Sequence, residues 1–187
     1  LQLGFEHISD LAGFDHILFL IALCAIYRLE QWRLLLILVT AFTVGHSITL
    51  ALASLGALTI SSELIEFLIP TTILLTALRN VVGPAATAER SAMGLNYAMA
   101  LFFGLIHGMG FSNYFRALMM GDTAIVMPLL GFNLGIELGQ LLVVAVIVGV
   151  AYLFLNVLGA KHREWNLFVS GAAAGMSLIL MAEARFW

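Results

Sequence analysis

Long apolar runs alternate with short polar breaks along the chain, and the runs are longer than ordinary strands. The runs cover residues 14–27, 32–55, 64–82, 95–119, 124–156 and 165–184. A helix of about 20 apolar residues crosses the hydrocarbon core of a bilayer. The pattern therefore predicts an all-α integral membrane protein, with residues 1–187 forming a single domain: a compact bundle of about six transmembrane helices.

The first 13 residues depart from this pattern because they carry Glu6, His7 and Asp10. A segment this polar does not cross a bilayer by itself, so we expect it to lie at the membrane surface or to enter the membrane as a short re-entrant piece. The chain starts at Leu1 and not at methionine. This start fits either a removed signal peptide or a shortened chain.

Basic residues gather in three of the five breaks, and this asymmetry predicts an orientation. The breaks after the first, third and fifth runs hold Arg28, Arg33, Arg79, Arg90, Lys161 and Arg163, whereas the other two hold only Arg116. Cytoplasmic loops of membrane proteins carry the excess of Lys and Arg, so we predict that these three breaks face the cytoplasm and that both termini lie outside.

Composition supports a membrane protein and narrows its partners. The chain is 62% hydrophobic and only 10% charged, with a mean hydropathy of +1.06, far from the values of soluble domains. The net charge is −3 and no basic run is present, which argues against a nucleic-acid partner. Cys24 is the single cysteine, so an internal disulfide is excluded.

A polar stripe interrupts the fifth apolar run. Asn133, Glu137 and Gln140 follow a spacing of four and three residues, which places them on one face of a helix. A carboxylate in a membrane is costly unless it is paired, protonated or bound to a cation. We therefore interpret Glu137 as part of a site, with an interhelical ion pair or a protonated, hydrogen-bonding acid as the structural alternative.

Histidines and further carboxylates accompany this stripe in or at the mouths of the apolar runs. The candidate metal ligands are His7, Asp15, His16, His46, Glu66, His107 and Glu137. Imidazole and carboxylate are ligands that divalent first-row metals accept. Each residue also has a structural alternative, such as a surface histidine, a helix cap or an interhelical hydrogen bond. For Ser47, Asn133 and Gln140 the alternatives are packing between helices and orientation of a ligand.

Several ordered runs in the chain also resemble a known family. They lie at residues 5–8 (FEHI), 13–19 (GFDHILF), 40–50 (TAFTVGHSITL), 103–111 (FGLIHGMGF) and 132–140 (FNLGIELGQ). Over about residues 5–150 the chain resembles the HupE/UreJ family of bacterial membrane proteins, in particular its second branch. Members are described as hydrogenase or urease accessory proteins, and some are regarded as nickel or cobalt permeases.

The resemblance implies a metal-handling protein of the bacterial inner (cytoplasmic) membrane. It implies His7, Asp15 and His16 as a first metal-handling motif, with His46, Glu66, His107 and Glu137 as further candidates. The partners implied are the metal ion, the lipid bilayer, and a second copy of the chain or a metalloenzyme-maturation protein.

Three functions remain open on the sequence. The first is a transporter for a divalent transition metal, of the nickel or cobalt type, with an intramembrane site of histidines and carboxylates. The second is an intramembrane zinc hydrolase that uses the same residues, with Glu137 or Glu66 as general base toward a metal-bound water. The third is a membrane scaffold whose polar residues only join helices.

Overall fold

The computed structural model describes residues 1–10, 13–58, 60–83, 90–118 and 126–184. In these ranges the chain is helical and contains no strand. The helices, in order, are α1 (Gln2–Ser9), α2 (Asp15–Cys24), α3 (Trp32–Ser54), α4 (Ser62–Val82), α5 (Arg90–Gly110), α6 (Ser112–Leu118), α7 (Val126–Tyr152) and α8 (His162–Glu183). A 3-10 turn at Leu29–Gln31 precedes α3, and a π-helical turn at Leu153–Val157 extends α7.

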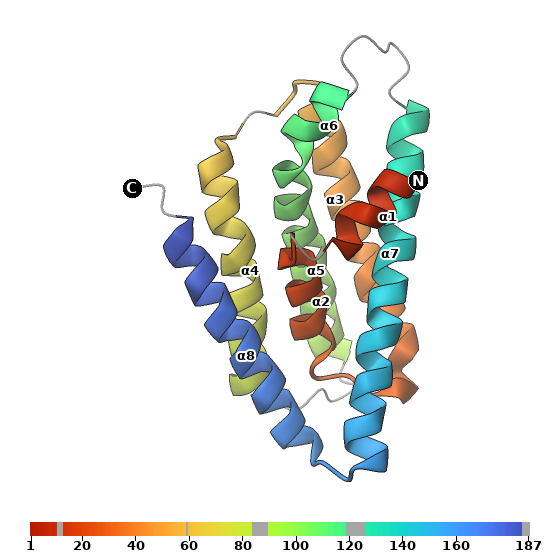
Figure 1. The fold of residues 1–187 in the computed structure, drawn as a ribbon, viewed down its shortest axis with the longest axis vertical. Helices are drawn as coiled ribbons and strands as arrows, with labels where there is room; N and C mark the ends of the chain where they lie inside the picture. Colours follow the sequence, from red (N-terminus) through yellow and green to blue (C-terminus); the bar gives the residue numbers. More distant parts are fainter. Residues whose placement is uncertain (11–12, 59, 84–89, 119–125, 185–187) are drawn as a thin grey trace.

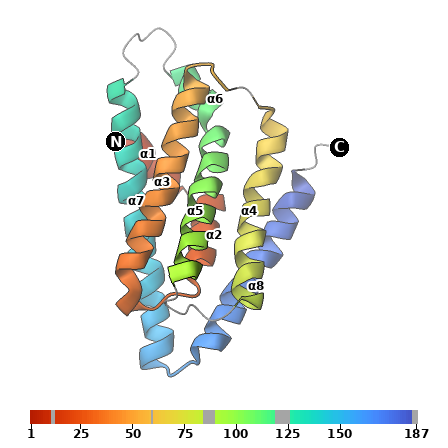
Figure 2. The same ribbon diagram turned by 180° about the vertical axis from the view of Figure 1, so that it is seen from behind.

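The long helices α3, α4, α5, α7 and α8 run side by side along the long axis of the molecule (Figure 1). The most extensive pairs are α3 with α5, α4 with α8, and α1 with α7. The short helix α2 lies in front of α5 in Figure 1 and beyond α5 in the reverse view of Figure 2. It contacts α4, α7 and α8, so it is enclosed by the longer helices.

The all-helical fold is confirmed, but the expected number of spans is not. Within the described residues, four helical segments are long and apolar enough to cross a membrane: Leu29–Ser54, Ser62–Val82, Val126–Val157 and His162–Glu183. The apolar run at residues 95–119 is divided between α5 and α6, because the helix is interrupted at Phe111.

The run at residues 14–27 was wrongly predicted to be a full span. Its helix, α2, has 10 residues, and at 1.5 Å per residue it is about 15 Å long, half the thickness of a hydrocarbon core. Its hydrophobicity reflects burial against other helices, since Phe19, Leu20 and Ala22 are each no more than 1% exposed. Hydrophobic runs of about 10–14 residues are more typical of buried helices than of spans.

Glycines bring two helix pairs together at backbone distance. A Cβ atom at Gly104 would collide with the Phe42 carbonyl, and one at Gly45 with the Leu101 carbonyl, so α3 and α5 are in direct backbone contact. In the same way, a Cβ atom at Gly4 would collide with the Phe132 carbonyl, which brings α1 against α7. These contacts bring the histidines of α1, α3 and α5 close to the start of α2.

Candidate metal centre

Three histidines from three different helices converge at the start of α2. His7 of α1, His16 of α2 and His46 of α3 each offer one ring nitrogen, and these nitrogens all lie within 4.8 Å of one another. The ring centroids of His7 and His16 are 4.7 Å apart, and both lie 6.1 Å from that of His46. We call these three residues the histidine trio.

His16 and His46 are buried, His7 is half-buried, and the ring nitrogens of all three are poorly satisfied. His46 is 0% exposed and His16 is 5% exposed. Within the described part of the chain, Nε2 of His7, Nε2 of His16 and both ring nitrogens of His46 have no hydrogen-bond partner. Leaving a buried polar group unpaired costs about 1–3 kcal/mol, so nitrogens gathered in this way suit a ligand that supplies the missing interaction.

Isolated unpaired nitrogens also occur elsewhere, so the convergence carries the argument. Nε2 of His162 and Nε1 of Trp165, both on α8, are buried and have no partner among the described residues. Neither belongs to a group of side chains with the geometry to hold a metal. What distinguishes the trio is that several lone pairs meet within the reach of one ion.

A carboxylate fixes the tautomer of His16. Nδ1 of His16 lies 2.9 Å from Oδ1 of Asp15, and the backbone N–H of His16 donates to the same oxygen at 2.8 Å. An ionised carboxylate only accepts hydrogen bonds, so Nδ1 carries the ring proton and Nε2 keeps its lone pair. The Asp15 contact thus orients Nε2 as a ligand, as carboxylate partners of metal-bound histidines do.

His107 of α5 lies beside the trio without belonging to it. Its ring centroid is 5.0 Å from that of His16, and its Nε2 lies 3.0 Å from Oγ1 of Thr72. The Thr72 hydroxyl already donates to the Ile69 carbonyl at 2.7 Å, so Nε2 of His107 is the donor of their contact. The lone pair of His107 is therefore on Nδ1, a buried atom without a partner in the described residues.

Aromatic rings enclose the imidazoles. The ring of Phe111 lies 4.1 Å from that of His7, and the ring of Phe42 lies 5.1 Å from that of His107 and 6.3 Å from that of His46. Phe132 of α7 contacts both His7 and His46. Such an apolar wall keeps the local dielectric constant low, which strengthens the attraction between a cation and its ligands.

An open pocket reaches the trio at α1. It has a volume of about 410 Å³, and its walls include Glu6, His7, Asp10, Phe111 and Tyr114. His7 is the member of the trio that lines this pocket. Two carboxylates at the entrance give it a negative character, which favours the entry of a cation.

The remaining predicted residues lie outside the trio. Glu137 accepts a hydrogen bond from Oγ1 of Thr40 at 2.6 Å, and Gln140 is 2.6 Å from Oγ1 of Thr43, so both join α7 to α3. Oδ1 of Asn133 is buried without a partner among the described residues. Ser47 donates to the Thr43 carbonyl at 2.7 Å.

Glu66 is exposed on α4, and no hydrogen bond or ion pair joins it to the described part of the chain. Neither Glu66 nor Glu137 belongs to the group of side chains with the geometry to hold a metal. The carboxylate in direct contact with the trio is Asp15.

Three threonines that hydrogen-bond to predicted site residues were not predicted from the sequence. Thr72 faces His107, Thr40 faces Glu137, and Thr43 faces Gln140. Threonine is common in transmembrane helices, where its hydroxyl bonds to the preceding turn, so its presence gave no signal. One local hint existed for Thr72: it follows the helix-interior Pro70, where the regular hydrogen-bond ladder of the helix is broken.

Comparison with known proteins yields one result. A family model described as HupE / UreJ protein matches residues 1–186. No curated protein and no solved structure matches the chain.

Proposed function

Because the chain belongs to the HupE/UreJ family, we propose that it transports a divalent transition-metal cation across the membrane and that the histidine trio binds the ion on its way. The observation that supports this most is the convergence of three imidazoles from α1, α2 and α3, two buried and one half-buried, on a space within the reach of one ion. Residues so distant in the sequence do not meet by local spacing, and their lone pairs have no other use among the described groups.

The type of ligand favours nickel, cobalt or zinc over magnesium or calcium. Neutral imidazole suits the later first-row divalent metals, whereas the hard alkaline-earth ions prefer oxygen. The single cysteine, Cys24, is buried in the core around α2 and is not a member of the trio. Three protein ligands leave further positions of the metal open, so ligands can exchange, as transport requires.

The pocket at α1 supports an entry route. A cation that enters between Glu6 and Asp10 meets His7 first, because His7 forms part of the pocket wall. His46 and His16 lie deeper, at 0% and 5% exposure. The exposed carboxylates collect the hydrated ion, and the buried imidazoles replace its water.

His107 offers the next position along this route. The centroid of the His16 ring is 4.7 Å from that of His7 and 5.0 Å from that of His107. An ion released by His7 and His46 can stay bound to His16 while it gains Nδ1 of His107. One shared ligand lowers the barrier between two positions, since the ion is never fully without protein contacts.

The hydrolase alternative gains no support from the site. It needs a general base within hydrogen-bond reach of the metal-bound water. Both proposed bases lie elsewhere: Glu66 is exposed on α4, and Glu137 is bonded to Thr40. Orientation of the termini, oligomeric state and a metalloenzyme-maturation partner stay predictions of the sequence.

Metal uptake by proteoliposomes tests the proposal. We expect liposomes that contain the protein and trap a metal-sensitive dye to take up Ni²⁺ or Co²⁺ faster than protein-free liposomes. His46→Leu should abolish this increase, because Leu has a similar size and no lone pair. His162→Ala is the matched control, since it removes a partly buried histidine far from the trio in sequence and leaves the trio intact. Equal uptake by His46→Leu and the unmodified protein would overturn the proposal.

A further inference from the structure

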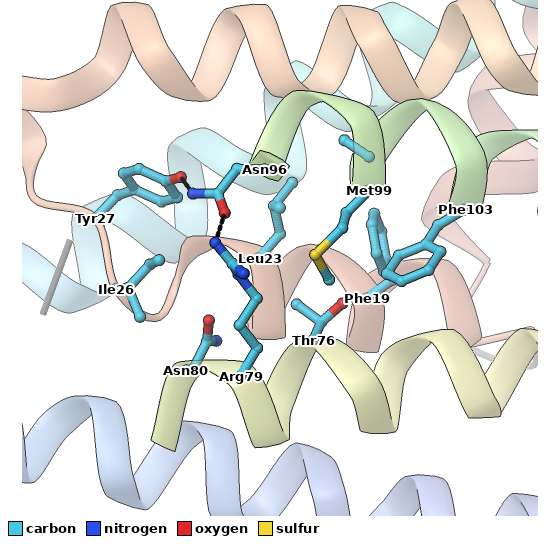
Figure 3. A pocket seen from close by; sticks show the side chains of 11 residues that line it. Phe19, Leu23, Ile26, Tyr27, Thr76, Arg79, Asn80, Asn96, Met99 and Phe103 are labelled. Carbon is cyan, nitrogen blue, oxygen red and sulfur yellow. Dashed lines mark hydrogen bonds between the residues drawn. The ribbon is translucent and has the colours of Figure 1, made fainter. Parts of the chain in front are cut away.

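A second cavity lies along α2, away from the α1 pocket (Figure 3). Phe19 and Phe103 line one end of it, Thr76 lies between, and Tyr27, Arg79 and Asn96 line the other. Its volume is about 20 Å³, room for about one water molecule. It belongs to no part of the metal centre described above.

One end of this cavity lies next to His107. The Phe19 ring is 5.4 Å from the ring of His107 and 6.2 Å from that of Phe103. Asn96 and His107 lie on the same helix, α5, roughly 16 Å apart along its axis at 1.5 Å per residue. The cavity therefore continues the line from the α1 pocket through the histidines toward the opposite end of the bundle.

Three polar side chains close the far end of the cavity. Nη2 of Arg79 donates to Oδ1 of Asn96 at 2.7 Å, and Nδ2 of Asn96 donates to the Tyr27 hydroxyl oxygen at 2.8 Å (Figure 3). One amide thus ties α4 and α5 to the segment that follows α2. We call Arg79, Asn96 and Tyr27 the polar clasp.

The clasp also places a positive charge in the route. No carboxylate of the described residues lies within ion-pair distance of Arg79. Arg79 is half-buried in the last turn of α4, and its side-chain partner there is the neutral amide of Asn96. A guanidinium without a carboxylate partner among the described residues repels a divalent cation, so the clasp blocks this end both sterically and electrostatically.

We propose that this cavity is the exit half of the cation's route and that the polar clasp is the gate that keeps the exit closed. The inference rests on the proposed transport function. The two ends of the bundle then differ as alternating access requires: the α1 pocket is open at about 410 Å³, whereas the cavity behind the clasp has only about 20 Å³. Release of the ion requires that Asn96 lose its bonds to Arg79 and Tyr27.

Cysteine labelling tests the gate without relying on transport. Thr76 lines the cavity and is 6% exposed, so Thr76→Cys in a Cys24→Ala background reports on access. A membrane-impermeant thiol reagent is applied to each side of sealed proteoliposomes. We expect Thr76→Cys alone to react slowly from both sides. Addition of Asn96→Ala should raise the labelling rate at least 10-fold from the clasp side and leave the rate from the α1 side unchanged.

Ser177→Cys is the matched control for general loosening. Ser177 is a small buried hydroxyl residue on α8 that lines none of the pockets described here, and it is 0% exposed. Its labelling should stay slow in the Asn96→Ala background. If Asn96→Ala fails to fold, Tyr27→Phe removes only one hydrogen bond of the clasp and should raise the Thr76→Cys rate roughly 2- to 10-fold from the clasp side.

The outcomes separate the gate from the transport function. An unchanged Thr76→Cys rate in the clasp variants, or equal acceleration of Ser177→Cys, overturns the gate even if the protein binds Ni²⁺. Clasp-side labelling that rises as expected, in a protein that neither binds nor takes up Ni²⁺, supports the gate as a conformational element and overturns the proposal that the route carries a divalent cation.

Discussion

Two buried polar clusters in this bundle show how a candidate site differs from polar groups that only hold helices together. In the histidine trio and His107, five buried ring nitrogens have no partner among the described residues. In the cluster that joins α2, α4 and α8, the polar groups find one another: Asn80 donates to the Ala22 carbonyl at 2.7 Å, Asn166 to the Asn80 carbonyl at 2.8 Å, and Ser170 to Asn166 at 2.9 Å. Both clusters are buried, so burial alone does not mark the site. What marks it is the number of buried polar atoms that have no hydrogen-bond partner among the described residues.

Loss of a trio ligand should lower the metal affinity more than any other substitution considered, and it should not lower the stability of the protein. We expect His46→Leu to weaken Ni²⁺ binding by about 100-fold or more, since even the loss of an outer partner of a ligand costs 10- to 100-fold. The variant should be no less stable than the unmodified protein, because it removes two unpaired buried nitrogens. Titration calorimetry and thermal unfolding in detergent measure both. A large loss of stability would mean that His46 is structural.

Asp15→Asn tests whether the carboxylate prepares His16 for a metal. The amide keeps the shape of the side chain but loses the charge that holds the proton on Nδ1 of His16. We expect Ni²⁺ affinity to fall roughly 10- to 100-fold. Asp10→Asn, at the wall of the open pocket, is the control and should change affinity far less.

Asn166→Ala should show the reverse behaviour in the satisfied cluster. The change removes the acceptor of the Ser170 hydroxyl and the side-chain donor to the Asn80 carbonyl, which costs about 1–3 kcal/mol of stability. Ni²⁺ affinity should stay within about twofold of the unmodified protein, because no trio contact is touched. A parallel loss of affinity would show that the two clusters are coupled and would weaken the distinction drawn between them.

Thr72→Val should separate binding from movement of the ion. It removes the acceptor that holds the proton on Nε2 of His107 but leaves the trio unchanged. We expect near-normal Ni²⁺ affinity and a roughly 2- to 10-fold slower uptake by proteoliposomes, which is the change in rate that corresponds to the free energy of one hydrogen bond. Thr71→Val on the same turn is the control, since its hydroxyl bonds only to the Phe67 carbonyl among the described residues.

Glu66→Gln should have the smallest effect. Glu66 is exposed and outside the trio, so neither Ni²⁺ affinity nor uptake should change by more than about twofold, within the usual effect of a surface substitution. A strong loss of uptake would mean that Glu66 contacts the ion during transport, which would require a rearrangement that brings α4 to the trio.

The sequence predicted the helical extents well where apolar runs are long and bounded by charges. The run at 32–55 corresponds to α3 and the run at 165–184 to α8, at residues 32–54 and 162–183. The prediction failed at α2, because a hydrophobic run shows that a segment is shielded from water but does not show whether lipid or protein surrounds it. The short length of the 14–27 run was the available warning.

The sequence also named all three trio residues but not their grouping. Periodicity places a residue on a face of its own helix, and it does not say which other helix that face meets. His16, His46 and Glu137 were therefore equivalent candidates, although Glu137 faces Thr40 while the histidines meet one another. The choice between them depends on glycine contacts between helices, such as Gly104 against Phe42.

The half-length of α2 has an electrical consequence. The pocket at α1 has room for water, and water there would carry the potential of that side of the membrane inward to His7. The membrane voltage then falls mainly over the short stretch beside α2, about 15 Å for its 10 residues. Moving one elementary charge through the full voltage is worth about 2.3 kcal/mol per 100 mV, and a divalent ion gains twice as much. On the proposed route, a short buried helix thus concentrates the driving force of an energised membrane on the single step between the histidines and the clasp.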